Sequence, residues 1–264
     1  FGVDGPGNTA FTFLNGQIYL FVNYHTNGSQ ARLITNRVFR DPSAWYNFHV
    51  TFDRANSTAA QRLRLYVNGV EETSFATDER SNIASDSSTG WNVSGLTAAI
   101  NRRSGGVDSR YHNGYLAQFY NIDGAVVAPT EFAETKDGVW IPKAYSGSYG
   151  NNGWLLEFKQ TGTGTGAANT VGADTSGNGN HWTSSGVAAT DVVSDSPTNN
   201  FSTFNPLDIT ATLAEGNLKW ESGANRSTML VPPDSGKWYV EFRTSTASAN
   251  GHYVVQFVYN KFFG

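Results

Sequence analysis

Hydrophobic and polar residues alternate along two neighbouring stretches of the chain, residues 45–53 and 63–67. A period of two predicts β-strands that bury one face. The polar residues 54–61 predict a loop between them. Asn68-Gly69 favours a type I′ hairpin turn, because both residue types tolerate positive φ, and the chain should turn back through residues 70–75. The predicted inward-facing residues are Tyr46, Phe48, Val50, Phe52, Leu63, Leu65 and Val67.

The same alternation continues on both sides of this strand pair. Residues 9–39 predict a three-stranded meander with turns at Asn15-Gly16 and Asn27-Gly28. The central strand of the meander carries large residues on both faces, so we expect one face in the core and the other against a neighbour. Strand patterns return at residues 96–100 and 115–122.

Composition supports an all-β fold. The 264 residues are 14% aromatic and 15% charged and include 28 glycines, a profile that favours short strands and turns over amphipathic helices. The formal net charge of -4, with no Lys/Arg run, argues against nucleic-acid binding. The absence of cysteine excludes disulfides and thiolate metal sites. No apolar run reaches the roughly 18 residues that span a bilayer, so membrane insertion is not expected.

The composition changes after residue 132. Residues 133–206 are rich in Gly, Asn, Ser and Thr, and only Trp154–Lys159 has a clear strand pattern. Such a sequence buries little apolar surface by itself, so we expect an extended connector pinned to its neighbours by aromatic side chains. The predicted organisation is a β-sandwich over 1–132, a connector over 133–206 and a second sandwich, truncated, over 207–264. Because the first residue is not Met, we expect a longer polypeptide.

Two segments of the first domain resemble laminin-G-like domains, the jelly rolls also called concanavalin A-like lectin folds. One is the strand pair that ends in LRLYVNG at residues 63–69, and the other is GYLAQFYNIDG at residues 114–124, which resembles the closing strand of such a domain. The resemblance implies a laminin-G-like jelly-roll sandwich. A fold alone says little about function.

A second resemblance follows from four motifs in order: GVWIPKAY, GSYGNNGW, DTSGNGNHWT and DSPTNNF, within residues 138–201. This succession looks like virion proteins of tailed, especially marine, bacteriophages. LAEGNLKW (213–220) and GKWYVEF (236–242) resemble the opening strands of a SPRY-like sandwich.

The resemblance implies a non-catalytic fibre or capsid-exterior protein on the virion surface. Its expected partners are other virion proteins, copies of itself in a homo-oligomer and host-surface glycans. The alternative is a secreted bacterial carbohydrate-binding protein.

Candidate catalytic groups are poorly spaced. A glycan hydrolase of this fold would need Glu-x-Asp-x-x-Glu on one strand, and no such triplet occurs. Glu71 and Glu72 are adjacent, which sends their side chains to opposite faces of a strand. The histidines lack zinc-binding spacing, and the glycines of Gly162–Gly166 lack the Lys-Ser/Thr of a phosphate loop, so a linker is the better interpretation. The sequence predicts no enzyme.

Two binding hypotheses remain. Asp174 and Asn178, within Asp-Thr-Ser-Gly-Asn-Gly-Asn, are calcium candidates, because alternating oxygen-bearing side chains around glycines suit a hard cation. The alternative is a hydrogen-bonded asparagine turn. No other cofactor is predicted. Trp91, Tyr111 and Trp182 are candidates for stacking on sugar rings, with packing inside the protein as the alternative.

Overall fold

The computed structural model describes residues 1–3, 9–23, 30–41, 44–85, 90–91, 95–101, 111–112, 114–199, 201–205 and 212–222. These residues form an all-β protein of antiparallel sheets, joined by loops and four short 3-10 turns. Contacts divide the chain into two compact units, residues 1–201 and 202–264. Among the described residues, no helix has the length and apolar character needed to cross a membrane.

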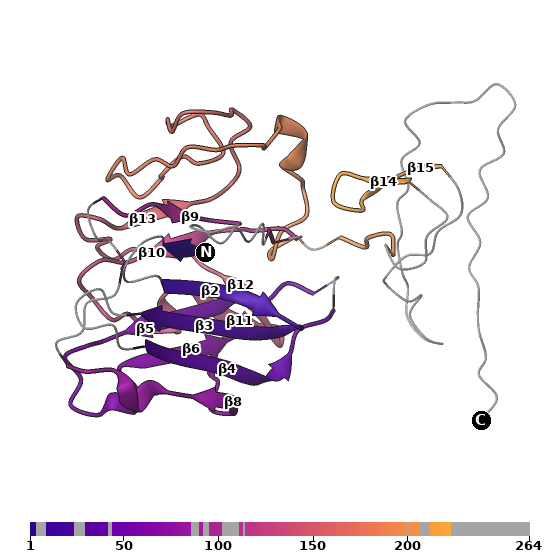
Figure 1. The fold of residues 1–264 in the computed structure, drawn as a ribbon. Coiled ribbons are helices and arrows are strands. Elements are labelled where there is room, and N and C mark those ends of the chain that lie inside the picture. The colour runs from indigo at the N-terminus through magenta and orange to yellow at the C-terminus, as the bar shows by residue number, and fades with distance from the viewer. Residues whose placement is uncertain are drawn as a thin grey trace, which may run out of the picture. The chain divides into compact units, whose positions relative to one another are not determined.

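A six-stranded sheet forms one layer of the first unit, with strand order β8-β4-β3-β2-β1-β9 (Figure 1). Asn15 and Gly16 have φ of 54° and 81° and join the second and third strands, as the sequence predicts. The Asn27-Gly28 turn lies outside the described residues. The strands are β1 (Gly2–Val3), β2 (Thr9–Leu14), β3 (Gln17–Asn23), β4 (Gln30–Val38), β8 (Phe75–Asp78) and β9 (Ala98–Ala99).

The second layer is the three-stranded sheet β5-β6-β7, made of β5 (Phe48–Phe52), β6 (Leu63–Val67) and β7 (Val70–Glu71). Val67 pairs with Val70 across Asn68 and Gly69, whose φ values of 49° and 78° fit the predicted turn. The predicted loop before β6 contains a single 3-10 turn, Ala59–Gln61. The antiparallel pair predicted from the alternating pattern is therefore confirmed.

The core lies between these two sheets. Ile18 of β3 packs with Leu65 and Val67 of β6, and all three side chains are at most 2% exposed. A neighbouring cluster joins the six-stranded sheet to β6 in the same way; its buried members are Leu20, Val22, Ala31, Leu33, Leu63 and Ile83. Burial of each Leu or Ile side chain stabilises the folded state by about 1.5–3 kcal/mol. This facing of two sheets is sandwich-like.

Strand β5 departs from the predicted burial pattern. Val50, on the core side with its pairing partner Leu65, is 36% exposed, because β5 is an edge strand. On the opposite side, Thr51 is 8% exposed and the ring of His49 lies 5.5 Å from that of Phe132. Phe132, at the end of the predicted sandwich, therefore covers part of the side of β5 that alternation alone marks as polar.

The connector contains more regular structure than its composition predicts. Strand β13 begins at Trp154 as expected, but it ends at Leu156 and pairs with β10 (Phe119–Asn121). A hairpin of β11 (Ala133–Lys136) and β12 (Val139–Pro142) was not predicted, although Asp137-Gly138 at its turn is a hairpin signal. The remaining 3-10 turns are Arg80–Asn82, Pro129–Glu131 and Ala189–Asp191.

The second unit is described over a short part of its length. Strands β14 (Thr212–Ala214) and β15 (Lys219–Ser222) form an antiparallel hairpin from the LAEGNLKW segment. Its turn contains Glu215 and Asn217 at positive φ. The GKWYVEF segment lies outside the described residues. The SPRY-like identity of this unit stays a prediction.

Candidate functional site

An aromatic pocket of about 150 Å³ lies in the first unit, and residues of the short strands β1, β9 and β13 form part of its lining. Four rings line it: Phe1, Trp91, Trp154 and Trp182. Two of the three residues proposed from sequence to stack on sugars, Trp91 and Trp182, therefore come together. The third, Tyr111, is 69% exposed and does not line the pocket.

The rings of the aromatic pocket hold one another in place. Phe1 lies 4.4 Å from Trp91 between ring centroids and 6.3 Å from Trp182. Trp154 meets Trp182 edge to face at 5.0 Å, a favoured aromatic geometry. Small aliphatic residues, among them Val3 and Ala98 of the paired strands β1 and β9, complete the wall.

The buried side-chain amide of Asn121 fixes the position of Trp91. Its indole N–H donates to Oδ1 of Asn121 at 2.9 Å, and the side-chain amide of Asn121 donates to the backbone oxygen of Asn152 at 3.2 Å. Asn121 is 6% exposed and lies in β10, opposite Trp154 of β13. The β10-β13 ladder thus positions both tryptophans of this wall.

Glycines allow the backbone of Trp182 to pack closely against an earlier part of the connector. The backbone N–H of Trp182 donates to the backbone oxygen of Gly172 at 2.8 Å. A Cβ atom at Gly172 would lie 2.2 Å from the backbone oxygen of Trp182. At the end of the glycine run Gly162–Gly166, a Cβ on Gly166 would lie 2.8 Å from the same oxygen. Gly166 therefore has a packing role against Trp182.

The indole groups of the five tryptophans in the first unit fall into two sets. Those of Trp45, Trp91 and Trp140 each donate to a side-chain oxygen, at 2.9–3.2 Å. In the part of the chain that the structure describes, the indole N–H groups of Trp154 and Trp182 have no acceptor, and neither nitrogen is completely buried. Both tryptophans line the aromatic pocket, although Trp154 as a whole is only 5% exposed. The pocket walls therefore contain two unused hydrogen-bond donors.

The carboxylate of Asp174 organises the turn that precedes Trp182. Its Oδ1 accepts the backbone N–H groups of Leu155 and Ser176, each at 2.9 Å, and its Oδ2 accepts that of Asn180 at 2.8 Å. Burial alone raises the pKa of Asp174, but these hydrogen bonds outweigh it and hold the pKa below its ordinary value. The charged carboxylate thus stabilises the turn.

Asn178 also acts as a donor within this turn. Its amide nitrogen donates to the oxygens of Gly150 and Gly153 at 2.6 and 2.9 Å, and Asn180 reaches Gly153 in the same way. This geometry favours the hydrogen-bonded turn over a cation site. Within the described ranges no three His, Asp or Glu side chains gather closely enough to hold a metal ion. Calcium binding at Asp174 and Asn178 stays a prediction.

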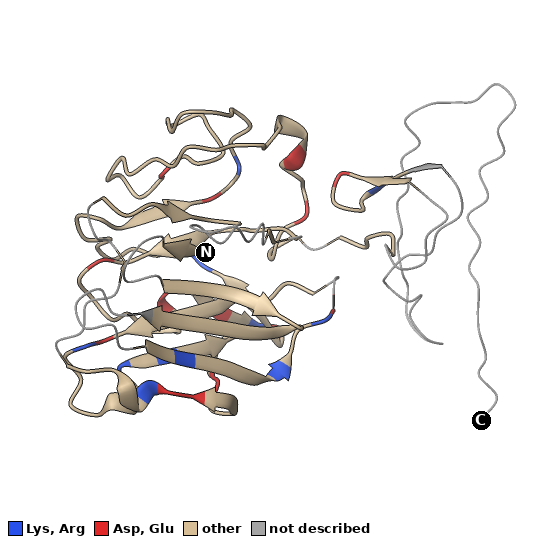
Figure 2. Ribbon diagram, viewed as in Figure 1, with Lys and Arg blue, Asp and Glu red and all other residues tan. Residues whose placement is uncertain are grey.

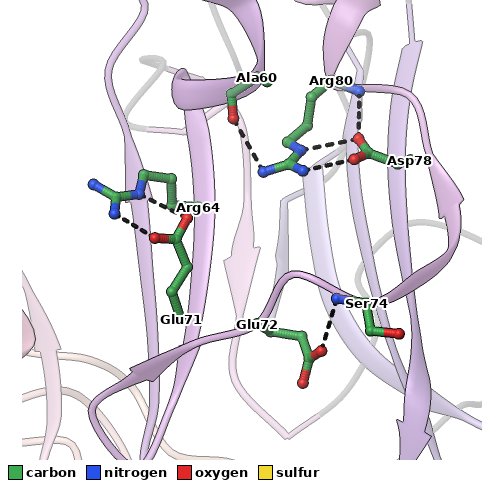
Figure 3. Close-up of polar contacts among 7 residues, drawn as sticks. All are labelled: Ala60, Arg64, Glu71, Glu72, Ser74, Asp78 and Arg80. Atoms are coloured by element: carbon green, nitrogen blue, oxygen red, sulfur yellow. Dashed lines mark hydrogen bonds and ion pairs between the residues drawn. The ribbon is translucent and has the colours of Figure 1, made fainter.

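The adjacent carboxylates Glu71 and Glu72 are engaged separately, and Figure 3 shows them pointing in different directions. Glu71 forms a two-point ion pair with Arg64, with 2.9 Å between Nε and Oε1, and this pair holds the Glu71 pKa below its ordinary value. Glu72 accepts the Ser74 N–H at 3.0 Å. The aromatic pocket differs from this region because no charged side chain lines it. Charged residues lie elsewhere, and Figure 2 shows several of them on β4 and β8.

Comparison with known proteins identifies no relative of the chain. No family model matches it, no curated protein matches it, and no solved structure matches it. The laminin-G-like, SPRY-like and virion resemblances are therefore carried by the sequence motifs alone.

Proposed function

We propose that the chain is a non-catalytic structural and adhesion component of a tailed bacteriophage virion, displayed as a fibre or capsid-exterior protein. In this proposal residues 1–132 are a laminin-G-like jelly roll and the second unit is the start of a SPRY-like sandwich. The virion surface is its location, where it meets other virion proteins, further copies of itself and host glycans.

The observation that supports this proposal is the set of hydrogen bonds that the four virion-type motifs form within the first unit. In GVWIPKAY, the indole of Trp140 donates to Asn47 at 3.2 Å, on the segment that leads into β5. In DSPTNNF, Asp195 accepts the indole N–H of Trp45 at 3.1 Å and the backbone N–H of Phe201 at 2.8 Å. Both motifs therefore attach the connector to the segment that leads into β5.

The other two motifs bind each other. The amides of Asn178 and Asn180 in DTSGNGNHWT donate to the backbone of GSYGNNGW, in both cases to the oxygen of Gly153 at 2.9 Å. All four motifs thus form hydrogen bonds within one compact unit, residues 1–201. Motifs committed to packing a connector onto a β-sandwich suit a displayed structural module.

Mass spectrometry of purified particles tests this proposal. Particles released from cells that carry the gene for the chain are separated on a density gradient. The amount of the chain in the particle band is compared with the amount in the free-protein fractions at the top. We expect its peptides to band with the major capsid protein at a fixed copy ratio. Recovery solely in the free-protein fractions contradicts the virion role.

A secreted carbohydrate-binding protein is the second candidate, and the aromatic pocket favours it. Trp91 and Trp182 line one pocket, and the indole N–H of Trp182 is unused. Tryptophan faces and indole donors are suited to sugar rings. Recovery of the chain in a bacterial secretome, without phage particles, would support this candidate against the first.

A further inference from the structure

We propose that the aromatic pocket binds one neutral six-membered sugar ring, the terminal residue of a glycan. The inference rests on the proposed adhesion role for its biological setting, but its physical basis is separate. It assigns a ligand class to the pocket lined by Phe1, Trp91, Trp154 and Trp182.

The walls of the aromatic pocket combine two properties that a sugar requires. Their four aromatic rings offer apolar faces to the C–H groups of a pyranose. The indole N–H groups of Trp154 and Trp182 are unclaimed among the described residues, whereas Trp45, Trp91 and Trp140 all have acceptors. A ligand that fills this pocket would shield both donors from water, and a shielded donor without a partner is costly, so the ligand should carry oxygen acceptors. A purely hydrocarbon ligand would leave both donors unpaired.

The size and charge of the pocket narrow the ligand further. A volume of about 150 Å³ is the cavity size that holds one benzene-sized ring, so the pocket has room for part or all of one six-membered ring and not for two. The lining side chains are uncharged, and burial lowers the pKa of the Phe1 amino group to about 6, so at neutral pH the pocket favours a neutral hexose over a uronic acid. Binding should therefore depend little on ionic strength.

Saturation-transfer NMR and calorimetry on the 264-residue chain test the assignment. The probes are methyl glycosides of glucose, galactose and mannose, with methyl glucuronide and toluene as comparisons. We expect at least one neutral glycoside to bind more tightly than both comparisons. Trp182→Phe keeps an aromatic ring but removes the indole donor, and should weaken binding about fivefold or more. Trp154→Phe tests the other donor in the same way.

Tyr111→Ala is the matched control, because Tyr111 is an aromatic residue outside the pocket and 69% exposed. It should leave glycoside binding unchanged, and thermal melts should show each variant folded at the assay temperature. The assignment is overturned if no neutral glycoside binds, if toluene or the glucuronide binds as tightly, or if Trp182→Phe and Trp154→Phe both bind normally. Particle mass spectrometry decides the virion role independently of these results.

Discussion

Replacing Asp174 by Asn probes the turn on which Trp182 depends. Asp174 is 6% exposed, and its carboxylate accepts three backbone N–H groups at 2.8–2.9 Å. The amide keeps one oxygen, which can retain Leu155 and Ser176, but its NH₂ group then opposes the N–H of Asn180. Hydrogen bonds to charged groups contribute about 1.5–3 kcal/mol each. The variant loses the hydrogen bond from Asn180 and keeps those from Leu155 and Ser176 to a neutral oxygen in place of a charged one. Asp174→Asn should therefore reduce the free energy of unfolding by about 2–4 kcal/mol.

The measurement is urea unfolding followed by tryptophan fluorescence, with Asp137→Asn as control. Asp137 is exposed in the β11-β12 turn at φ 51°, a conformation that Asn adopts readily, so the control should change stability by less than about 0.5 kcal/mol. Thermal melts should show Asp174→Asn lowered by roughly 5–15 °C, from about 2–4 °C per kcal/mol for a unit of this size.

Acid should remove the difference between the wild type and Asp174→Asn. Because the folded-state pKa of Asp174 lies below its ordinary value, the unfolded chain takes up a proton first as pH falls. Its contribution is complete above about pH 4 and is lost as pH falls through the folded-state pKa. Equal urea midpoints for the two proteins at pH 7 would refute the role given to Asp174. Added calcium should leave the wild-type midpoint unchanged; a rise that Asp174→Asn abolishes would establish the calcium site instead.

Two further predictions concern the sandwich. Gly69→Ala places a Cβ 2.6 Å from the Trp140 ring at φ 78°, whereas Gly138→Ala at φ 80° meets nothing within 4 Å, so the first should cost about 1–3 kcal/mol more in urea unfolding. Equal losses would show that Trp140 does not pack against the turn. Burial lowers the pKa of His49 despite its hydrogen bond to a backbone oxygen, so the wild type should lose stability below about pH 6.5, its unfolded value. His49→Gln should remove that loss, and parallel pH profiles of the two proteins would contradict the assignment.

Local signals explain which parts of the fold are predictable from sequence. Asn15-Gly16 and Asn68-Gly69 determine turns through their own positive-φ tolerance, and both turns are found where expected. The hairpin at Asp137-Gly138 carries the same kind of signal but lies in a glycine-rich context that predicts irregular chain. The burial of His49 could not be predicted from local signals, because its hydrogen-bond partner, the backbone oxygen of Val127, lies 78 residues later in the sequence.

The aromatic pocket was predictable in part for the same reason. The sequence marks Trp91 and Trp182 as candidates for sugar stacking, and the structure places both in the lining of one pocket. Phe1 and Trp154 reach the pocket through the pairing of β1 with β9 and of β10 with β13, which joins residues far apart in sequence. No periodicity within a single stretch encodes such pairing, so their contribution needed the three-dimensional structure.

Electron microscopy of gold-labelled particles tests the proposed virion role most directly. Antibodies raised against residues 1–201, the first compact unit, are applied to intact particles released from cells that carry the gene for the chain. The proposal predicts label at symmetric, repeated positions on fibres or on the capsid exterior. Unlabelled particles alongside antibody-reactive protein free in the medium would contradict it.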